Sequence, residues 1–221
     1  MRNLYNEWLE KSLYQEELQG IVDEAEVEDR FYQKVPFGTG GMRGKLGAGT
    51  NRMNIHTIRL VAEGLAREID KQGELAKMRG VVIAYDTRHF SQEFAYETAG
   101  VLAAHGIQSY VFTASRPTPE LSFAVRYLAA YAGVVITASH NPKQYNGFKV
   151  YGEDGAQLTP QFADDIVAHM NAVENLFTIE SLNREQLRAS GLCVEILKKL
   201  DDAYNTALKS LVIAGEKDLQ L

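Results

Sequence analysis

A serine and a histidine stand side by side in the segment Thr137-Ala-Ser-His-Asn-Pro142, which Lys143-Gln-Tyr-Asn-Gly-Phe-Lys149 follows directly. The apolar run Ala132–Ile136 that precedes them is typical of a buried strand. Ser139 and His140 are therefore expected on an exposed turn at the carboxyl end of a strand, which is where open α/β sheets bind their ligands. A serine in such a place is a candidate nucleophile or phosphoryl carrier.

Local chemistry narrows the interpretation of Ser139. A serine hydrolase would place its nucleophile in a Gly-x-Ser-x-Gly elbow, whereas Ala138 and His140 flank this serine. Neighbouring side chains on an extended loop point to opposite sides, so His140 is poorly placed as the base of a triad. It also lacks a second histidine or cysteine at zinc-ligand spacing. A simple turn, in which Ser139 and Asn141 satisfy the backbone before Pro142, stays open.

The second stretch with chemical potential is Phe37–Thr50, which has too many glycines for a regular element. Its backbone N–H groups could approach an anion closely, and Arg43 and Lys45 supply positive charge. A dinucleotide fingerprint fails because Arg43 stands where it needs glycine, and a Walker A loop fails at Thr39 and Leu46. A flexible linker would not carry the Met, Leu and Arg side chains. The stretch is therefore expected to contact phosphate or a sugar phosphate.

The elements that must position these residues alternate along the chain. Apolar residues at helical spacing predict two N-terminal helices and a longer helix from Asn54, and Ser91 is expected to cap another. The runs at 81–85, 107–112 and 133–137 read as strands, and Thr118-Pro119 and Thr159-Pro160 open further helices. This order predicts right-handed βαβ crossovers and a three-layer α/β/α fold with a mainly parallel, mixed sheet.

The turns that follow the three strands are expected at one edge of the sheet, where Asp86 and Arg88 would meet the serine segment. Residues 148–155 look like the start of a hairpin. Beyond Asn175 we expect a polar connection, and from Val194 a final amphipathic helix whose apolar face has no evident partner.

Composition bounds the class of protein. The 221 residues are 45% hydrophobic and 24% charged, with a net charge of −6, which argues against a dedicated nucleic-acid binder. No apolar run approaches the roughly 20 residues of a membrane-spanning helix, and the N-terminus has no signal-peptide core. A single cysteine, Cys193, cannot form an internal disulfide. A reduced, cytoplasmic protein is expected.

The serine segment with Asn146-Gly-Phe-Lys149 resembles the active-site loop of the α-D-phosphohexomutases, the phosphoglucomutase and phosphomannomutase superfamily. Phe37–Gly44 is similar to that family's N-terminal Gly-Thr-x-Gly-x-Arg-Gly loop. Gly47–Asn54 and the leader that contains Trp8 resemble the bacterial α-phosphoglucomutase and phosphopentomutase branch. The two motifs occur in the family's order, so the resemblance is specific, and it reaches to about residue 180. It implies the first domain of the phosphohexomutase fold.

The resemblance implies that Ser139 is a phosphoserine that exchanges its phosphoryl group with a hexose phosphate, such as glucose 1-phosphate or glucose 6-phosphate. The exchange would pass through a sugar bisphosphate, which also serves as activator, and Mg²⁺ would bind an oxygen of the serine phosphate. Arg43 would contact that phosphate. Lys149 would stabilise charge or transfer a proton, and His140 would hydrogen-bond near the reacting oxygens. The other implied residues are Thr39, Gly40, Gly41, Lys45, Asn141 and Arg88 for phosphate binding, and Asp86 and Thr137 as supports. A surface salt bridge is the alternative for Arg88.

The sequence also departs from the family. Family members have four domains, with an Asp-Gly-Asp-x-Asp-Arg metal loop on the second and a Gly-Glu-x-Ser-Gly-His sugar loop on the third, and neither motif occurs here. We expect a helical leader at 1–36, the first domain at 37–180, and a linker with the opening helix of a truncated second domain at 181–221. Such a chain should lack mutase turnover, because one wall of a cleft cannot hold the reactants in place.

Two other functions stay open at this point. An unpartnered tail helix and an exposed interdomain face would suit a non-catalytic binding or self-associating module. A serine hydrolase would require Ser139 to react with a fluorophosphonate, which we do not expect. Nothing in the sequence chooses between glucose, mannose and pentose phosphates.

Overall fold

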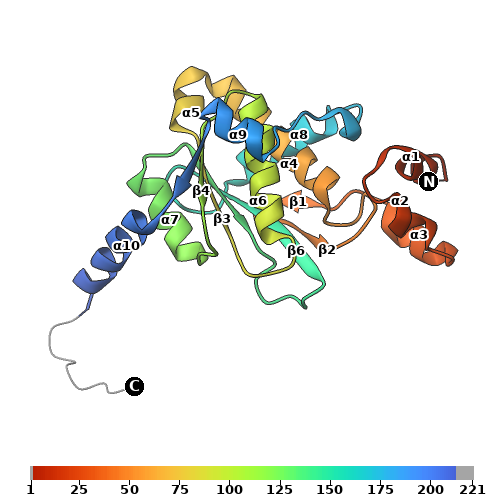
Figure 1. Ribbon diagram of the computed structural model, residues 1–221, viewed down its shortest axis with the longest axis horizontal. Coiled ribbons are helices and arrows are strands. Elements are labelled where there is room, and N and C mark those ends of the chain that lie inside the picture. The colour runs from red at the N-terminus through yellow and green to blue at the C-terminus, as the bar shows by residue number, and fades with distance from the viewer. Residues whose placement is uncertain (1, 213–221) are drawn as a thin grey trace, which may run out of the picture.

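A seven-stranded mixed sheet forms the centre of the molecule in a computed structural model, which describes residues 2–212 (Figure 1). The strand order is β1-β2-β6-β5-β3-β4-β7. The strands are β1 (Phe37–Gly38), β2 (Gly41–Lys45), β3 (Val81–Tyr85), β4 (Ser109–Phe112), β5 (Ala132–Ile136), β6 (Tyr145–Tyr151) and β7 (Cys193–Ile196).

Helices cover both faces of this sheet, which confirms the predicted three-layer α/β/α fold. One apolar cluster joins α4, α6, α8 and α9 to one face, and a second joins α7 and α10 to the other. The helices are α1 (Arg2–Lys11), α2 (Gln15–Gln19), α3 (Glu24–Phe31), α4 (Ile55–Gln72), α5 (Glu74–Arg79), α6 (Ser91–Ala104), α7 (Thr118–Tyr127), α8 (Pro160–Asn171), α9 (Arg184–Ser190) and α10 (Lys198–Ser210), with a 3-10 turn at Leu176–Thr178. None of the helices in this described part combines the length and apolarity that a bilayer crossing requires.

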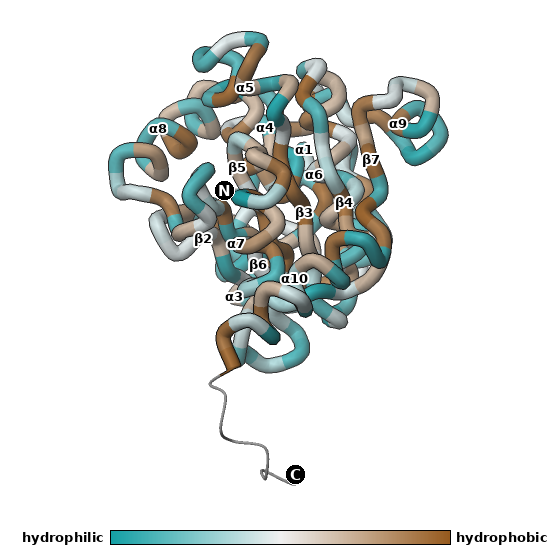
Figure 2. Tube along the Cα trace, turned by 90° about the vertical axis from the view of Figure 1, so that its left-hand side faces the viewer, coloured by the Kyte–Doolittle hydropathy of each residue, from teal (hydrophilic) through white to brown (hydrophobic). Residues whose placement is uncertain are grey.

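The central strands β3 and β5 are buried along their whole length because apolar residues face both helical layers. Hydrophobic residues accordingly gather along the middle of the sheet (Figure 2). β5, β3, β4 and β7 run parallel, while β6 runs antiparallel to β5, with Phe148 opposite Ile136. The carboxyl ends of β3, β4 and β5 therefore share one edge, where Asp86 N donates to Ile136 O at 3.1 Å.

The glycine-rich stretch corrects one prediction, because its first half forms regular strands. β2 pairs antiparallel with β6, and Arg43 lies opposite Gly147. Gly41 has φ +83°, and a Cβ built on it would lie 2.2 Å from the carbonyl oxygen of Phe148. This glycine therefore allows close approach of two strands, and glycine density did not indicate irregular structure here.

The C-terminal region corrects a second prediction. Val194 lies in β7, which extends the sheet through parallel pairing with β4, so the expected polar connection also contains α9 and a strand. The last helix, α10, does have a partner: Leu200 is buried in the cluster with α7, and Arg116 binds Asp201 through two hydrogen bonds of 2.9 and 2.6 Å. Sequence reasoning missed this partner because it lies more than 80 residues earlier in the chain.

The N-terminal leader folds as three short helices rather than the predicted two. Trp8, Leu18 and Phe31 close a small apolar cluster together with Ala48, beside the outer strands β1 and β2 (Figure 1). Asn54 begins α4 with a reciprocal capping box that includes Thr57, as its position before the apolar pattern predicts.

Candidate active site

Ser139 lies on an exposed turn directly after β5, as predicted. Its φ is +57°, a left-handed conformation that is uncommon for a residue with a side chain. The Ser139 N–H donates to Thr137 Oγ1 at 3.0 Å, and the Asn141 N–H donates to the Ala138 carbonyl at 3.1 Å. Backbone strain of this kind persists only where surrounding residues hold the backbone in place, and it is typical of functional sites. The contacts that hold this loop therefore matter for its function.

The guanidinium group of Arg88 holds the loop. Its two Nη atoms donate to four backbone carbonyls of the serine loop at 2.6 to 3.1 Å, while Nε lies 3.2 Å from Asp86 Oδ2. The four acceptors are the carbonyl groups of Ser139, Asn141, Pro142 and Tyr145. The side chain of Arg88 is 15% exposed, so the salt bridge that was the alternative for this residue does form, with Asp86, but it is largely shielded and accompanies the four hydrogen bonds to the loop.

A buried polar network behind the loop was missed in the sequence analysis. Asn146 and Ser91 are both 0% exposed. Asn146 Nδ2 donates to Ser91 Oγ and to the His89 carbonyl, each at 3.0 Å, and Ser91 Oγ donates to Asp86 Oδ1 at 2.7 Å. The predicted cap is wrong: Ser91 is the first residue of α6, and Phe90 takes the cap position.

The signal for this network was present but incomplete. Asn146 belongs to the motif Asn146-Gly-Phe-Lys149, and a polar residue in a β-prone run suggests a buried partner. The network ties the end of β3, the start of α6 and the start of β6 into one unit, because Ser91 Oγ bonds to both Asp86 and Asn146. The Gly147 N–H also donates to Asn146 Oδ1 at 2.8 Å.

Arg43 brings positive charge from β2 to the serine loop, and Lys149 lies on the neighbouring strand β6. Arg43 Nη1 donates to Asn141 Oδ1 at 3.1 Å. A Cβ at Gly147 would lie 3.3 Å from Arg43 Cγ, so the arginine stem passes over this glycine. Burial and the nearby charge of Arg43 lower the pKa of Lys149, which favours release of its proton.

An open hollow of about 560 Å³ lies beside Ser139. Thr137, Asn141, Lys143 and residues 86–89 line it. This volume is within the range of small-molecule sites, and Arg88 and Lys143 suit it to an anionic ligand. Backbone carbonyls already occupy Arg88, so Lys143 is the more available of the two cations.

A second hollow of about 570 Å³, on the helical layer, is lined by Glu63, Arg67 and His105. His105 lies 2.9 Å from Glu63 and 2.7 Å from Asp70, and its hydrogen bond to Glu63 raises its pKa. These charged groups satisfy one another, so size alone does not make this hollow the chemical site.

The remaining candidate residues do not line the hollow beside Ser139. Thr39 and Gly40 form the exposed turn between β1 and β2, and Gly41 follows beside Lys149, whose Cα would lie 2.8 Å from a Cβ on this glycine. Lys45 lies near Asp29. The hydrogen bond from Arg52 is the main cause that lowers the pKa of Asp29, and the charge of Lys45 lowers it further. His140 is exposed, and no hydrogen bond joins it to Ser139 in the described residues, so they contain no catalytic triad at this serine.

These features define a class of protein: a three-layer α/β/α domain in which the strand-end turns meet around an exposed serine. The model of the family "Phosphoglucomutase/phosphomannomutase, alpha/beta/alpha domain I" matches residues 34–177. The chain therefore belongs to the phosphoglucomutase/phosphomannomutase family.

Individual relatives agree with this assignment. The phosphoglucomutase of Staphylococcus saprophyticus is 39% identical over 207 residues, which cover 94% of this chain and 36% of that protein. The phosphoglucomutase of a bovine strain of Staphylococcus aureus is 51% identical over 154 residues, which cover 70% of this chain and 26% of that protein. The chain thus spans about a third of the length of the curated relatives it matches.

Solved structures share the fold. A crystal structure described as a phosphomannomutase from Thermus thermophilus superposes with a TM-score of 0.66 and 30% identity, covering 82% of this chain and 37% of the other. The parafusin phosphoglucomutase of Paramecium superposes with a TM-score of 0.59 at 18% identity, covering 82% of this chain and 35% of the other, which supports the fold alone.

Proposed function

We propose that Ser139 is the phosphoryl carrier of a phosphohexomutase. The observation that carries the proposal is the fixed, left-handed turn that exposes Ser139 beside a hollow while Arg43 reaches the same loop. Arg43, Lys143 and Lys149 would offset the charge of a phosphate there, and Asn141 would orient it. Arg88, Asp86 and Thr137 would act on the loop rather than on the phosphate.

The proposed step is an in-line transfer. Ser139 Oγ attacks a phosphorus atom of a sugar bisphosphate, the Oγ–P bond forms, and the bond between phosphorus and the sugar oxygen breaks. The serine proton ends on the departing sugar oxygen. Lys149 can relay this proton because its lowered pKa allows it to lose and regain one, and His140 would hydrogen-bond at the same oxygens. The reverse step returns the phosphoryl group to the other position of the sugar.

Mg²⁺ is the metal that family membership leads us to expect, and in such sites it offsets charge on the transferred phosphoryl group. In the described residues no three His, Cys, Asp or Glu side chains are grouped to hold a metal. Asp86, the carboxylate of the hollow, is already bonded to Arg88 and Ser91. The side chains present therefore do not fit a bound Mg²⁺ by themselves. We propose that the phosphate on Ser139 supplies one ligand and that the others lie outside the described residues.

We further propose that a polypeptide of these 221 residues accepts phosphate but does not turn over. The relatives are about two and a half times as long, and sustained mutase activity needs both ends of the sugar held in register. The proposed domains are a leader at 1–36, the phosphoserine domain at 37–180, and a segment at 181–221 that leads into a second domain. A hexose phosphate substrate, a sugar bisphosphate activator and a cytoplasmic location complete the proposal.

Product release tests this function. Incubation of the chain with glucose 1,6-bisphosphate and Mg²⁺ should release about one glucose monophosphate per chain and then stop, because the serine becomes occupied. Ser139→Ala should release none. Steady conversion of glucose 1-phosphate to glucose 6-phosphate would contradict the absence of turnover, and a full burst from Ser139→Ala would contradict the role of the serine.

Self-association is a second candidate, and one observation favours it. The end of α10 exposes Leu208 by 43%, and Leu211 just beyond it by 76%. Exposed apolar residues that cluster on a helix often mark an interface. Light scattering after gel filtration separates the candidates, since a stable oligomer without a phosphate burst would favour a binding module.

A further inference from the structure

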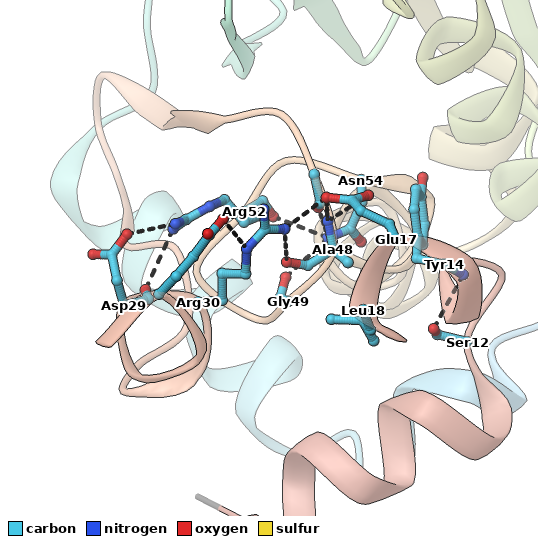
Figure 3. Close-up of polar contacts among 12 residues, drawn as sticks. Ser12, Tyr14, Glu17, Leu18, Asp29, Arg30, Ala48, Gly49, Arg52 and Asn54 are labelled. Atoms are coloured by element: carbon cyan, nitrogen blue, oxygen red, sulfur yellow. Dashed lines mark hydrogen bonds and ion pairs between the residues drawn. The ribbon is translucent and has the colours of Figure 1, made fainter. Parts of the chain in front are cut away.

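The segment that follows β2, residues 46–50, is covered by the N-terminal leader and does not face open solvent (Figure 3). The Ala48 N–H donates to both carboxylate oxygens of Glu17, at 3.1 and 3.2 Å. Arg30 Nη1 donates to the Ala48 carbonyl at 3.0 Å and to Glu17 Oε1 at 2.6 Å. One ion pair of the leader therefore satisfies both backbone groups of Ala48.

Two glycines make this docking possible. Gly47 has φ +139°, and a Cβ on it would lie 2.8 Å from Glu17 Oε1. Gly49 has φ +121°, and a Cβ on it would lie 2.6 Å from the Arg30 carbonyl. Both residues therefore need glycine for conformation and for space. These glycines admit the leader, whereas their place in the glycine-rich stretch predicts contact with an anion.

The ion pair is partly shielded from water. The side chain of Arg30 is 12% exposed, and although burial opposes its charge, hydrogen bonds to Glu26 and Glu17 raise its pKa. A second pair, Arg52 with Asp29, fastens the other end of the same segment, and the Asn51 N–H donates to the Arg30 carbonyl at 2.9 Å. The leader is thus held at several points along residues 47–52.

Hydrogen bonds continue from this segment to the active-site loops. The Gly47 N–H donates to the Met53 carbonyl at 3.2 Å, and the Met53 N–H donates to the Lys45 carbonyl at 2.8 Å, at the end of β2. The neighbouring Leu46 N–H donates to the Gln144 carbonyl, in the serine loop, at 2.8 Å. Only Lys45 and Gly44 separate Leu46 from Arg43.

We propose that the N-terminal helices form a positioning clamp in which Glu17 and Arg30 fix the end of β2, and with it Arg43, against the serine loop. Glu17 and Arg30 are positioning residues because they touch neither the hollow nor Ser139. The inference rests on the proposed role of Arg43 in phosphate binding. It assigns the leader a part in anion affinity, beyond its contribution to stability.

Glu17→Gln tests the clamp, with Glu16→Gln as the matched control, because the exposed Glu16 side chain makes no hydrogen bond or ion pair with the described residues. Inorganic phosphate is titrated into the full chain, and the NMR signals of the Arg43 side chain and the Ser139 amide report binding. We expect Glu17→Gln to weaken phosphate about three- to tenfold, the equivalent of roughly one hydrogen bond. Hydrogen exchange of the Leu46 amide should become faster in the same variant, and Glu16→Gln should change neither.

The melting temperature of each variant separates positioning from stability. A lower melting temperature with unchanged phosphate affinity and unchanged Leu46 exchange would overturn the clamp and leave the leader a structural role only. If the unmodified chain shows no phosphate shift at Arg43, the proposed anion site fails. Leu46 exchange would still decide whether Glu17 fixes the end of β2.

Discussion

The serine loop, residues 137–147, and the glycine segment, residues 46–50, lie next to each other but are held in opposite ways. The serine loop is fixed from inside the domain by Arg88 and the buried side chains of Asn146 and Ser91. The glycine segment is fixed from outside by Glu17 and Arg30 of the leader. In the first case side-chain donors satisfy backbone carbonyls and leave Ser139 exposed, while in the second the backbone itself is covered.

This difference shows where glycine is informative. Both glycines of the second segment are required by leader atoms that approach within about 3 Å of their missing Cβ atoms. The chemical site is instead marked by a strained non-glycine residue, Ser139, and by a half-buried arginine, Arg88, that binds four carbonyls. Glycine density alone therefore did not locate the anion site.

The largest expected effect is on the free energy of unfolding, which should fall more when Arg88 is replaced than when Arg30 is replaced. Arg88→Ala should lower the free energy of unfolding by about 3 kcal/mol, because four carbonyls and Asp86 lose a shielded charged partner. Arg30→Ala should cost about 1 to 2 kcal/mol, since Glu17 can still accept from Ala48. Urea unfolding measures both values, and an equal cost for the two variants would contradict the internal fixation of the serine loop.

Acid should release the leader before it disturbs the serine loop. His56 is 3% exposed, its Nε2 accepts from the Leu13 N–H at 3.2 Å, and burial, with a smaller effect of Arg59, lowers its pKa from 6.5 to about 4. Its stabilising contribution is complete above pH 6.5 and is lost as the pH falls towards 4, because the undocked histidine binds a proton more readily. The loss can reach about 3 kcal/mol.

Fluorescence of Trp8 reports this transition, since Trp8 is the single tryptophan and packs edge-on against His56 at 5.3 Å. The emission should change as the pH falls from 6.5 towards 4. His56→Gln, which does not titrate but can still accept from Leu13, should flatten that change. An identical pH profile in this variant would show that another group controls docking.

A pair of glycine substitutions gives a smaller effect. Gly49→Ala should cost about 2 kcal/mol because it combines positive φ with a clash against the Arg30 backbone. Gly40→Ala should be nearly neutral, since no atom lies within 4 Å of the added Cβ. Thermal unfolding measures both. Equal costs at the two positions would mean that leader contact does not explain Gly49.

The smallest expected effect concerns the charge around Ser139. Replacement of Arg43 by Gln should raise the pKa of Lys149, because one of the two causes that lower it is the arginine charge. Replacement of Lys45 by Gln serves as control, since Lys45 is not among the causes. NMR titration of the Lys149 side chain measures the shift. An unchanged pKa in the Arg43 variant would remove Arg43 from the electrostatics of the site.

Much of the fold could be predicted because its signals are local. The strands around Val81–Tyr85 and Ala132–Ile136 follow from continuous apolar runs, and the helices after Asn54 and Thr159 follow from cap residues before an apolar pattern. β2 and β7 were missed because neither carries such a pattern. β2 is a strand only because β6 pairs with it, and β7 only because it extends β4.

Some features of the candidate site could likewise be predicted from the sequence, and others could not. The exposed turn of Ser139 and its meeting with Arg88 could be predicted from strand order, since parallel strands bring their carboxyl ends together. Asn146 and Ser91 could not, because their hydrogen bond joins residues 55 positions apart. The contacts of Gly47 and Gly49 with the leader could not be predicted either, because Glu17 and Arg30 are distant in sequence and lie on separate helices.

The central claim is that Ser139 carries phosphate, and the mass of the intact chain tests it most directly. After incubation with glucose 1,6-bisphosphate and Mg²⁺, the chain should gain the mass of one phosphate group, and fragmentation should locate that group on Ser139. Ser139→Ala should gain none under the same conditions. No added phosphate on the unmodified chain, or the same gain in Ser139→Ala, would contradict the claim.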